Sequence, residues 1–116
     1  MDKSEPFKNV ENRIFRIRGK RVMLDRDLAE FYEVKTYQLR QRVKKNITRF
    51  PKDSMFRLTR QELLRCQAGR PNESVRRSLP YAFTGQGFAM LSTVLNSKRA
   101  ILVNIQIIRE STGLLR

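Results

Sequence analysis

The chain contains no histidine and no tryptophan, and Cys66 is its only cysteine. A structural zinc site needs four Cys or His ligands and a disulfide needs two cysteines, so neither can form within one chain. The side chain that most often serves as a general base is also missing. We therefore expect no metal site and no cofactor, and we do not expect an enzyme. Cys66 has no evident activating partner, which indicates an inert residue at a helix end.

Acidic residues are scarce, with 11 Asp and Glu against 25 Lys and Arg, so the 116-residue chain carries a net charge of +14. Such an excess indicates a polyanionic partner, nucleic acid first, although ribosomal and membrane-surface proteins share it. Long hydrophobic runs are missing too, because 101–108 is too short to cross a bilayer and contains Asn104 and Gln106. The N-terminus has no hydrophobic signal core. We expect a cytoplasmic protein that does not associate with membranes.

The length fits one small domain, and 40% apolar residues with ten aromatics favour a folded chain. Residues 1–12 are polar and predict a flexible leader, 13–110 form the single domain, and 111–116 are expected to fray. Two short runs around Arg18-Gly19-Lys20 predict a basic β-hairpin over 14–24. Asp25 is a candidate N-cap for a short acidic helix that ends near Glu33.

The stretch 36–49, TYQLRQRVKKNITR, carries six positive charges once Lys35 is included, and it contains no acid. Leu39, Val43 and Ile47 recur every four residues, which predicts a helix over 36–47 with one apolar side. Gln, Lys, Arg and Tyr side chains occupy its other faces. Taken alone, such a helix is more often a solvated surface than a binding element.

The neighbouring residues favour a helix-turn-helix over 25–49, because an acidic helix and a basic helix are joined by a tight turn. Thr36 is a candidate N-cap for the second helix, and Ala29 stands where the helices must approach closely. Glu33 stands where the turn favours glycine, since the backbone there is left-handed. The shared core of the unit is predicted to contain Leu28, Tyr32, Val34 and Leu39.

After the helix-turn-helix, 55–58 predicts a strand that joins the sheet of the hairpin, and Thr59 to Glu62 is a capping box that opens a helix to about Arg65. Residues 67–78 form a loop whose Arg70, Arg76 and Arg77 are candidates for phosphate contact. An extended stretch at 79–83 precedes a helix capped by Thr84, with close packing expected at Gly85 and Gly87. The core candidates of that helix are Phe88, Met90, Leu91, Val94 and Leu95.

The final helix, 97–110, is apolar on all sides, so we expect it to be buried on several sides. One side carries Ile101, Ile105 and Ile108, and the other sides carry Leu102, Val103 and Ile107. A homodimer through 97–110 would cover the remaining apolar surface. These elements together predict an α+β fold, a small winged helix-turn-helix-like domain with a β-hairpin and C-terminal helices.

Two stretches carry a resemblance to a known family: IFRIRGKRVMLDRDLAEFYEVKTYQLRQRVKKNITRFPKDSMFRLT and LPYAFTGQGFAMLSTVLNSKRAILVNIQIIR. They resemble the KilA-N-related phage and prophage DNA-binding domains, in the branch called the open-reading-frame-six N-terminal domain. The resemblance implies a sequence-specific DNA-binding module of a bacterial mobile element, often part of an antirepressor-like regulator. Glu33 and Gly85 depart from the pattern, and the residues from Ser111 do not continue the expected helix. That last departure indicates a truncated chain or a lineage without the effector segment.

The primary hypothesis is a transcriptional regulator that binds double-stranded DNA and lies with the bacterial nucleoid. Helix 36–47 would enter the major groove, where Gln38 and Gln41 would read base edges. The expected DNA-binding residues are Lys35, Tyr37, Gln38, Gln41, Arg42, Lys44, Lys45 and Arg49, with Arg18, Lys20 and Arg21 of the hairpin tip. The alternative is an antirepressor-like module that binds a repressor or another regulator through its apolar C-terminal helix. RNA binding is a third reading, for which no aromatic stacking platform is evident.

Overall fold

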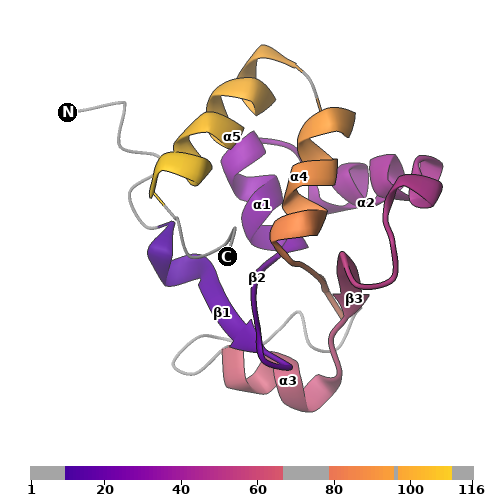
Figure 1. The fold of residues 1–116 in the computed structure, drawn as a ribbon, viewed down its shortest axis with the longest axis vertical. Helices are drawn as coiled ribbons and strands as arrows, with labels where there is room; N and C mark the ends of the chain where they lie inside the picture. The colour runs from indigo at the N-terminus through magenta and orange to yellow at the C-terminus, as the bar shows by residue number, and fades with distance from the viewer. Residues whose placement is uncertain (1–9, 67–78, 96, 111–116) are drawn as a thin grey trace.

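The computed structural model describes residues 10–66, 79–95 and 97–110. Within them the chain forms an α+β fold of four strands and five α-helices, as predicted (Figure 1). A 3-10 helix, Glu11–Arg13, opens the fold, and a second one, Ile47–Arg49, follows α2. The elements in order are β1 Ile14–Ile17, β2 Lys20–Leu24, α1 Asp25–Tyr32, α2 Thr36–Lys45, β3 Met55–Arg57, α3 Arg60–Cys66, β4 Tyr81–Phe83, α4 Gly85–Val94 and α5 Lys98–Glu110.

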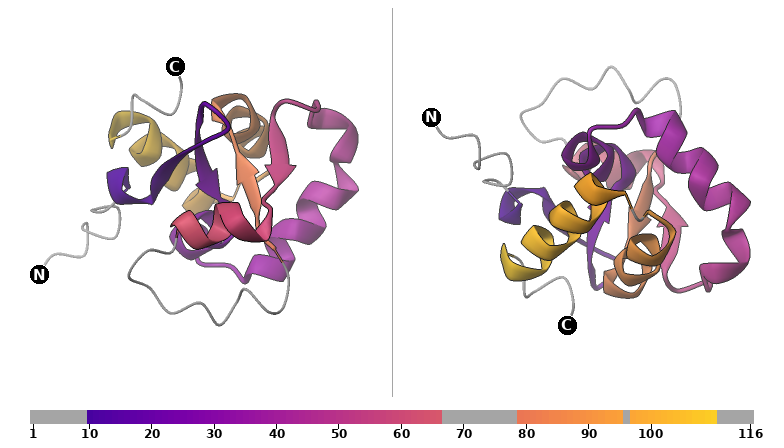
Figure 2. Two further views of the ribbon diagram at one scale, coloured as in Figure 1. Left: turned by 90° about the horizontal axis from the view of Figure 1, so that it is seen from below. Right: turned by 90° about the horizontal axis from the view of Figure 1, so that it is seen from above.

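The four strands form one antiparallel sheet in the order β1-β2-β4-β3, so β3 does join the sheet of the hairpin, through β4. Helix α3 covers one face of the sheet, and α1, α4 and α5 cover the other (Figure 2). Successive residues of a strand point to opposite faces, so Met23 packs with the larger helical layer while Val22 and Leu24 pack with α3. The sheet thus separates two hydrophobic cores.

The hairpin over 14–24 is confirmed, with Arg18 and Gly19 as its two turn residues. Both have positive φ, at 56° and 75°, as in the tight turns whose twist matches that of the flanking strands. The fold begins earlier than expected, because Val10 is buried against the larger core and Glu11–Arg13 is helical. The expected leader therefore does not extend to residue 12, and its residues 1–9 lie outside the described part of the chain, as do 67–78 and 111–116.

The turn between α1 and α2 has the left-handed geometry that the sequence predicts at Glu33, with φ 61° and ψ 43°. The Glu33 N–H donates to the Glu30 carbonyl at 3.1 Å and the Val34 N–H to the Ala29 carbonyl at 3.0 Å, which closes the helix with a Schellman motif. Leu28, Tyr32 and Leu39 are buried as predicted. Val34 is not part of this core: it follows the left-handed residue and is 39% exposed.

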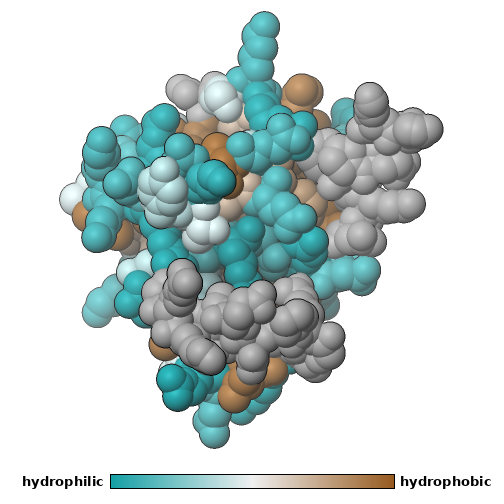
Figure 3. Space-filling model, turned by 180° about the vertical axis from the view of Figure 1, so that it is seen from behind, coloured by the Kyte–Doolittle hydropathy of each residue, from teal (hydrophilic) through white to brown (hydrophobic). Residues whose placement is uncertain are grey.

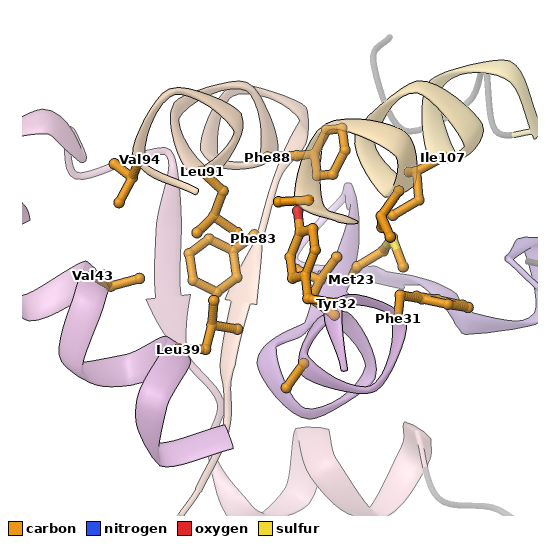
Figure 4. Packing of buried hydrophobic residues seen from close by; sticks show 14 of the residues in the cluster. Met23, Phe31, Tyr32, Leu39, Val43, Phe83, Phe88, Leu91, Val94 and Ile107 are labelled. Carbon is orange, nitrogen blue, oxygen red and sulfur yellow. The ribbon is translucent and has the colours of Figure 1, made fainter. Parts of the chain in front are cut away.

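Helix α2 is anchored by two apolar side chains, Leu39 and Val43, which point toward Phe83 of the sheet and the helix above it (Figure 4). The predicted third member of this side, Ile47, is 52% exposed. The reason is that α2 ends at Lys45, and the following 3-10 turn breaks the four-residue period. Thr36 is also not the N-cap: Lys35 is, and its backbone N–H donates to the Gln38 side-chain oxygen at 2.8 Å.

A buried carboxylate fixes α2 against the rest of the domain. Asp25 is the first residue of α1 rather than its N-cap, and it is fully buried. Its Oδ2 accepts from Arg40 Nε of α2 at 2.6 Å and from the Tyr81 N–H of β4 at 3.2 Å. Its Oδ1 is buried and has no hydrogen-bond partner among the described residues. One side chain therefore joins α1, α2 and the sheet, and Arg40 supplies its countercharge.

Helix α4 begins as predicted. The Thr84 hydroxyl caps it by accepting from the Gly87 N–H at 3.3 Å. Gly87 packs against backbone, because a Cβ there would lie 2.0 Å from the Ser54 carbonyl oxygen. Phe88, Leu91 and Val94 are buried, whereas Met90 and Leu95 are half-buried. Close packing at Gly87 is thereby confirmed.

Helix α5 is buried on one side, not on several sides as the sequence predicts. Ala100, Val103 and Ile107 are buried, whereas Ile101, Ile105 and Ile108 are 42–47% exposed. Polar contacts set this orientation. The Tyr32 hydroxyl donates to Asn104 Oδ1 at 2.6 Å inside the core, and Arg99 donates to the Phe31 carbonyl at 2.9 Å. Burial raises the Tyr32 pKa well above its usual value, so this hydroxyl keeps its proton.

We predict that Glu33→Gly stabilises the domain by about 0.5–1 kcal/mol. Glycine adopts positive φ without the cost of about 1–2 kcal/mol that a residue with a side chain incurs. Part of this gain in stability is lost, because glycine has a larger conformational entropy in the unfolded chain. Urea unfolding measures the change. Glu33→Ala is the control, because it keeps a strained side chain and loses the ion pair with Arg99. A Glu33→Gly protein no more stable than the wild type would contradict the strain at this turn.

We predict that Arg40→Met destabilises the domain by about 3 kcal/mol, because it leaves the buried Asp25 carboxylate without its countercharge. The matched control is Arg42→Met on the exposed side of the same helix, for which we expect less than about 0.5 kcal/mol. Chemical denaturation of the two variants gives the comparison. Equal losses for both would show that the Asp25–Arg40 contact does not anchor α2.

Candidate nucleic-acid interface

Helix α2 forms a ridge at the edge of the molecule in all three ribbon views (Figures 1 and 2). Its buried side is narrow, with Leu39 and Val43 inside and Arg40 half-buried between α2 and α1. The remaining side chains face outward, and the view from behind shows a largely hydrophilic surface on this side (Figure 3). The exposed residues of α2 are Tyr37, Gln38, Gln41, Arg42, Lys44 and Lys45.

A hollow lies along each flank of the ridge. The first, of about 240 Å³, lies between α2 and strands β3 and β4, and Gln41, Lys44 and Arg57 are among its lining residues. The second, of about 290 Å³, lies between α2, the preceding turn and the end of α4, and it includes Gln41, Arg42 and Lys45. Gln41 is the exposed residue that borders both hollows, so it lies on the crest of the ridge.

Charges of opposite sign are separated in the described part of the chain. Five acidic side chains form ion pairs with four arginines, in the pairs Asp25–Arg40, Asp27–Arg13, Glu30–Arg13, Glu33–Arg99 and Glu62–Arg18. The exposed cations on and next to α2 form no ion pair with a described acid; they are Lys35, Arg42, Lys44, Lys45 and Arg49. Five acids of the described chain thus neutralise structural arginines, and none of them pairs with an exposed cation of the α2 surface.

The structure brings the predicted residues of the basic stretch, from Lys35 to Arg49, onto one continuous exposed surface. Tyr37 is 62% exposed at the first turn of α2. Gln38 differs from the others because its side-chain oxygen accepts the Lys35 N–H, which uses one of its two acceptor positions and fixes the direction of its amide. Gln41 is exposed and has no side-chain hydrogen bond of this kind within the described chain.

The hairpin tip differs from the α2 surface because its first arginine, Arg18, forms an ion pair. Arg18 donates to both carboxylate oxygens of Glu62 in α3, at 2.8 and 3.1 Å, and its guanidinium lies 4.2 Å from the centre of the Phe56 ring. Hydrogen bonding to Arg18 lowers the pKa of Glu62. Arg18 thus holds the tip against α3, whereas Lys20 and Arg21 are exposed.

Sequence reasoning missed Arg57, which lines the first hollow from β3. The alternation Met55-Phe56-Arg57 places Arg57 on the same face of the sheet as Met55. That alternation does not reveal that β3 would lie beside α2. The position of β3 depends on its pairing with β4, in which Arg57 lies opposite Tyr81, 24 residues later in the chain. No signal in the sequence alone identifies this neighbour.

The described residues contain no group of three or more His, Cys, Asp or Glu side chains that could hold a metal ion. None of the helices in the described ranges is long and apolar enough to cross a membrane.

Comparison with curated proteins and with solved structures gives no match for this chain. A family model described as the ORF6N domain matches residues 12–94. The match begins at the 3-10 helix that precedes the hairpin and ends with α4, so it contains the sheet and the α1–α2 unit. It also contains every lining residue of the first hollow and all but Leu95 of the second. Because the match to this phage-type family covers well over half of the chain, the protein belongs to the ORF6N domain family.

Proposed function

We propose that this ORF6N domain binds double-stranded DNA in a sequence-specific manner, as part of a phage- or prophage-type transcriptional regulator. The observation that carries the proposal is the α2 ridge, whose exposed cations form no ion pair with a described acid, while five of the described acids pair with structural arginines. A surface of this kind attracts the phosphate backbone, which supplies much of the affinity of a DNA-binding protein.

The shape of the surface also fits duplex DNA. The major groove is about 12 Å wide and admits an α-helix, provided that the helix stands clear of the body of its domain. Helix α2 has a hollow on each flank, so the two backbones that border a major groove have room beside it. Cations line both hollows, with Lys44 on one flank and Arg42 on the other.

Gln41 is the best candidate for reading a base edge. It lies on the crest between the hollows, and a side-chain amide can contact adenine through two hydrogen bonds. Gln38 is partly engaged, because its side-chain oxygen supports the start of α2. Lys45 lines the second hollow, while Lys44, Arg49 and Lys35 are exposed and are proposed to hold phosphates.

The regulatory setting follows from the family. We extend the phage-type assignment to the KilA-N-related, antirepressor-type branch because the hairpin, the α1–α2 unit and the Thr84-capped helix occur in the expected order. In this proposal the domain locates the regulator on bacterial DNA, in the cytoplasm.

Selection of bound sequences from random duplex DNA tests the proposal. We expect a short motif to be enriched at physiological salt, and we expect affinity to fall steeply with salt, about 10³- to 10⁵-fold between 50 and 200 mM for six to ten phosphate contacts. Failure to enrich any duplex sequence, or equal binding to structured RNA, would argue against the proposal.

We predict that Gln41→Ala relaxes the sequence preference at one or two base pairs, because a lost base contact costs about 1–3 kcal/mol of discrimination. Lys45→Ala should instead weaken all sequences alike and reduce the slope of log K against log salt by about 0.9. Titrations of the selected site and of single-base variants of it distinguish the two outcomes. If both variants lose affinity uniformly, Gln41 does not read a base.

A second candidate function rests on α5. Its outer face carries Ile101, Leu102, Ile105 and Ile108, each 42–60% exposed, which is a large apolar surface for so basic a domain. A regulator that acts by binding a repressor would use this face, as would a homodimer through 97–110. DNA binding by α2 depends on neither repressor binding nor dimer formation.

We predict that Leu102→Lys abolishes self-association or repressor binding through α5 while leaving the fold intact, because this side chain is 60% exposed. Sedimentation of the wild type and the variant measures self-association, and thermal unfolding checks the fold. The DNA affinity of a single domain should be unchanged. An α5 variant that remains in the same assembly as the wild type would remove this face from consideration.

A further inference from the structure

The hollow between α2 and β3 carries basic side chains from both elements. Strand β3 is the outer strand of the sheet and pairs with β4 on one side. Met55 and Arg57 of this strand point to the same face of the sheet as α2, and both line the hollow. The opposite wall includes Gln41 and Lys44 of α2 and the exposed Ile47 of the 3-10 turn that follows it. A helix and an edge strand thus form a groove of about 240 Å³ with cations on both walls.

Arg57 is held in place before any ligand arrives. Its guanidinium lies 4.7 Å from the centre of the Tyr81 ring, its direct cross-strand neighbour. Tyr81 is itself fixed, because its N–H donates to the buried Asp25 carboxylate. Arg57 is exposed and forms no ion pair with an acid in the described ranges, so stacking on an aromatic ring orients the guanidinium without neutralising it.

The acid in this groove does not oppose an anionic ligand. Asp25 lines the hollow, but it is fully buried beneath the surface and paired with Arg40 at 2.6 Å. The charges that reach the surface of the groove are therefore those of Lys44 and Arg57. Its apolar part includes Ile47 and Met55, which suit the carbon face of a sugar better than a charged group.

We propose that this groove binds the sugar-phosphate backbone of one DNA strand, with Arg57 and Lys44 contacting phosphate oxygens and the exposed Ile47 packing against deoxyribose. This inference rests on the proposed function, since a helix in the major groove has a backbone along each flank. It assigns the flanking contact to β3, the strand that follows α2 in the chain, and not to the hairpin tip, where Arg18 is held by Glu62.

The test compares Arg57→Ala with Arg60→Ala on the selected duplex. Arg60 is an exposed arginine at the start of α3, on the opposite face of the sheet, so its removal controls for the loss of one charge. We expect Arg57→Ala to weaken binding roughly 5- to 10-fold near 0.1 M salt and to reduce the salt slope by about 0.9, with base preference unchanged. Arg60→Ala should change affinity less than about 2-fold.

The stacked ring provides an independent readout. Tyr81→Phe keeps the ring and should bind as the wild type does, whereas Tyr81→Leu frees the guanidinium and should weaken binding about 2- to 4-fold. In the Arg57→Ala background, Tyr81→Leu should have no further effect on affinity. Circular dichroism and thermal unfolding confirm that each variant is folded, and Arg57→Lys, which keeps the charge, remains informative if Arg57→Ala does not fold.

The outcomes separate this inference from the proposed function. If the wild-type protein binds no duplex DNA, both the proposed function and the groove inference are wrong. If the wild type binds duplex DNA specifically but Arg57→Ala and Arg60→Ala reduce its affinity by the same small factor, the proposed function is retained and the groove inference is wrong. An acidic peptide provides a further check. If it competes with DNA, and if Arg57→Ala weakens its binding as much as it weakens DNA binding, the groove recognises negative charge in general and the inference about the sugar-phosphate backbone is wrong.

Discussion

The contact between the Asp25 carboxylate and Arg40 is the interaction on which the arrangement of this domain depends. Asp25 is fully buried where α1 begins, Arg40 belongs to α2, and the Tyr81 N–H that shares the same oxygen belongs to β4. A buried carboxylate is costly without a countercharge, so this contact favours one orientation of α2 over the alternatives. The same contact fixes the position of Tyr81 and, through its ring, that of Arg57. The proposed recognition helix and the proposed backbone groove thus share one anchor.

The small number of acidic residues also determines which basic side chains are left without an ion pair. Five of the described carboxylates pair with Arg13, Arg18, Arg40 and Arg99, which join the 3-10 helix, the hairpin tip, α2 and α5 to the body of the fold. The lysines and arginines that remain on the surface of α2 are left without partners of opposite sign among the described residues. Five of the cations that make up the net charge of +14 lie exposed on and next to α2, and none of the five forms an ion pair with a described acid.

Local features of the fold could be predicted from the sequence, and features set by distant contacts could not. The hairpin turn at Arg18-Gly19, the left-handed Glu33 and the Thr84 cap all depend on residues within a few positions of each other. The buried side of α5 could not be predicted, because two apolar sides have the same period and the choice depends on Tyr32 reaching Asn104, 72 residues away. Arg18 was assigned to phosphate without knowledge of Glu62, and Arg57 was overlooked because the strand order places β3 beside α2.

The most direct test of the account is to map amide chemical-shift changes when the selected duplex is added to the isotopically labelled domain. If α2 enters the major groove, the largest changes will lie in Thr36–Lys45, with a second group in β3 at Met55–Arg57 and small changes on the outer face of α5. Changes centred on Ile101, Leu102 and Ile105, with α2 unaffected, would contradict DNA recognition by α2.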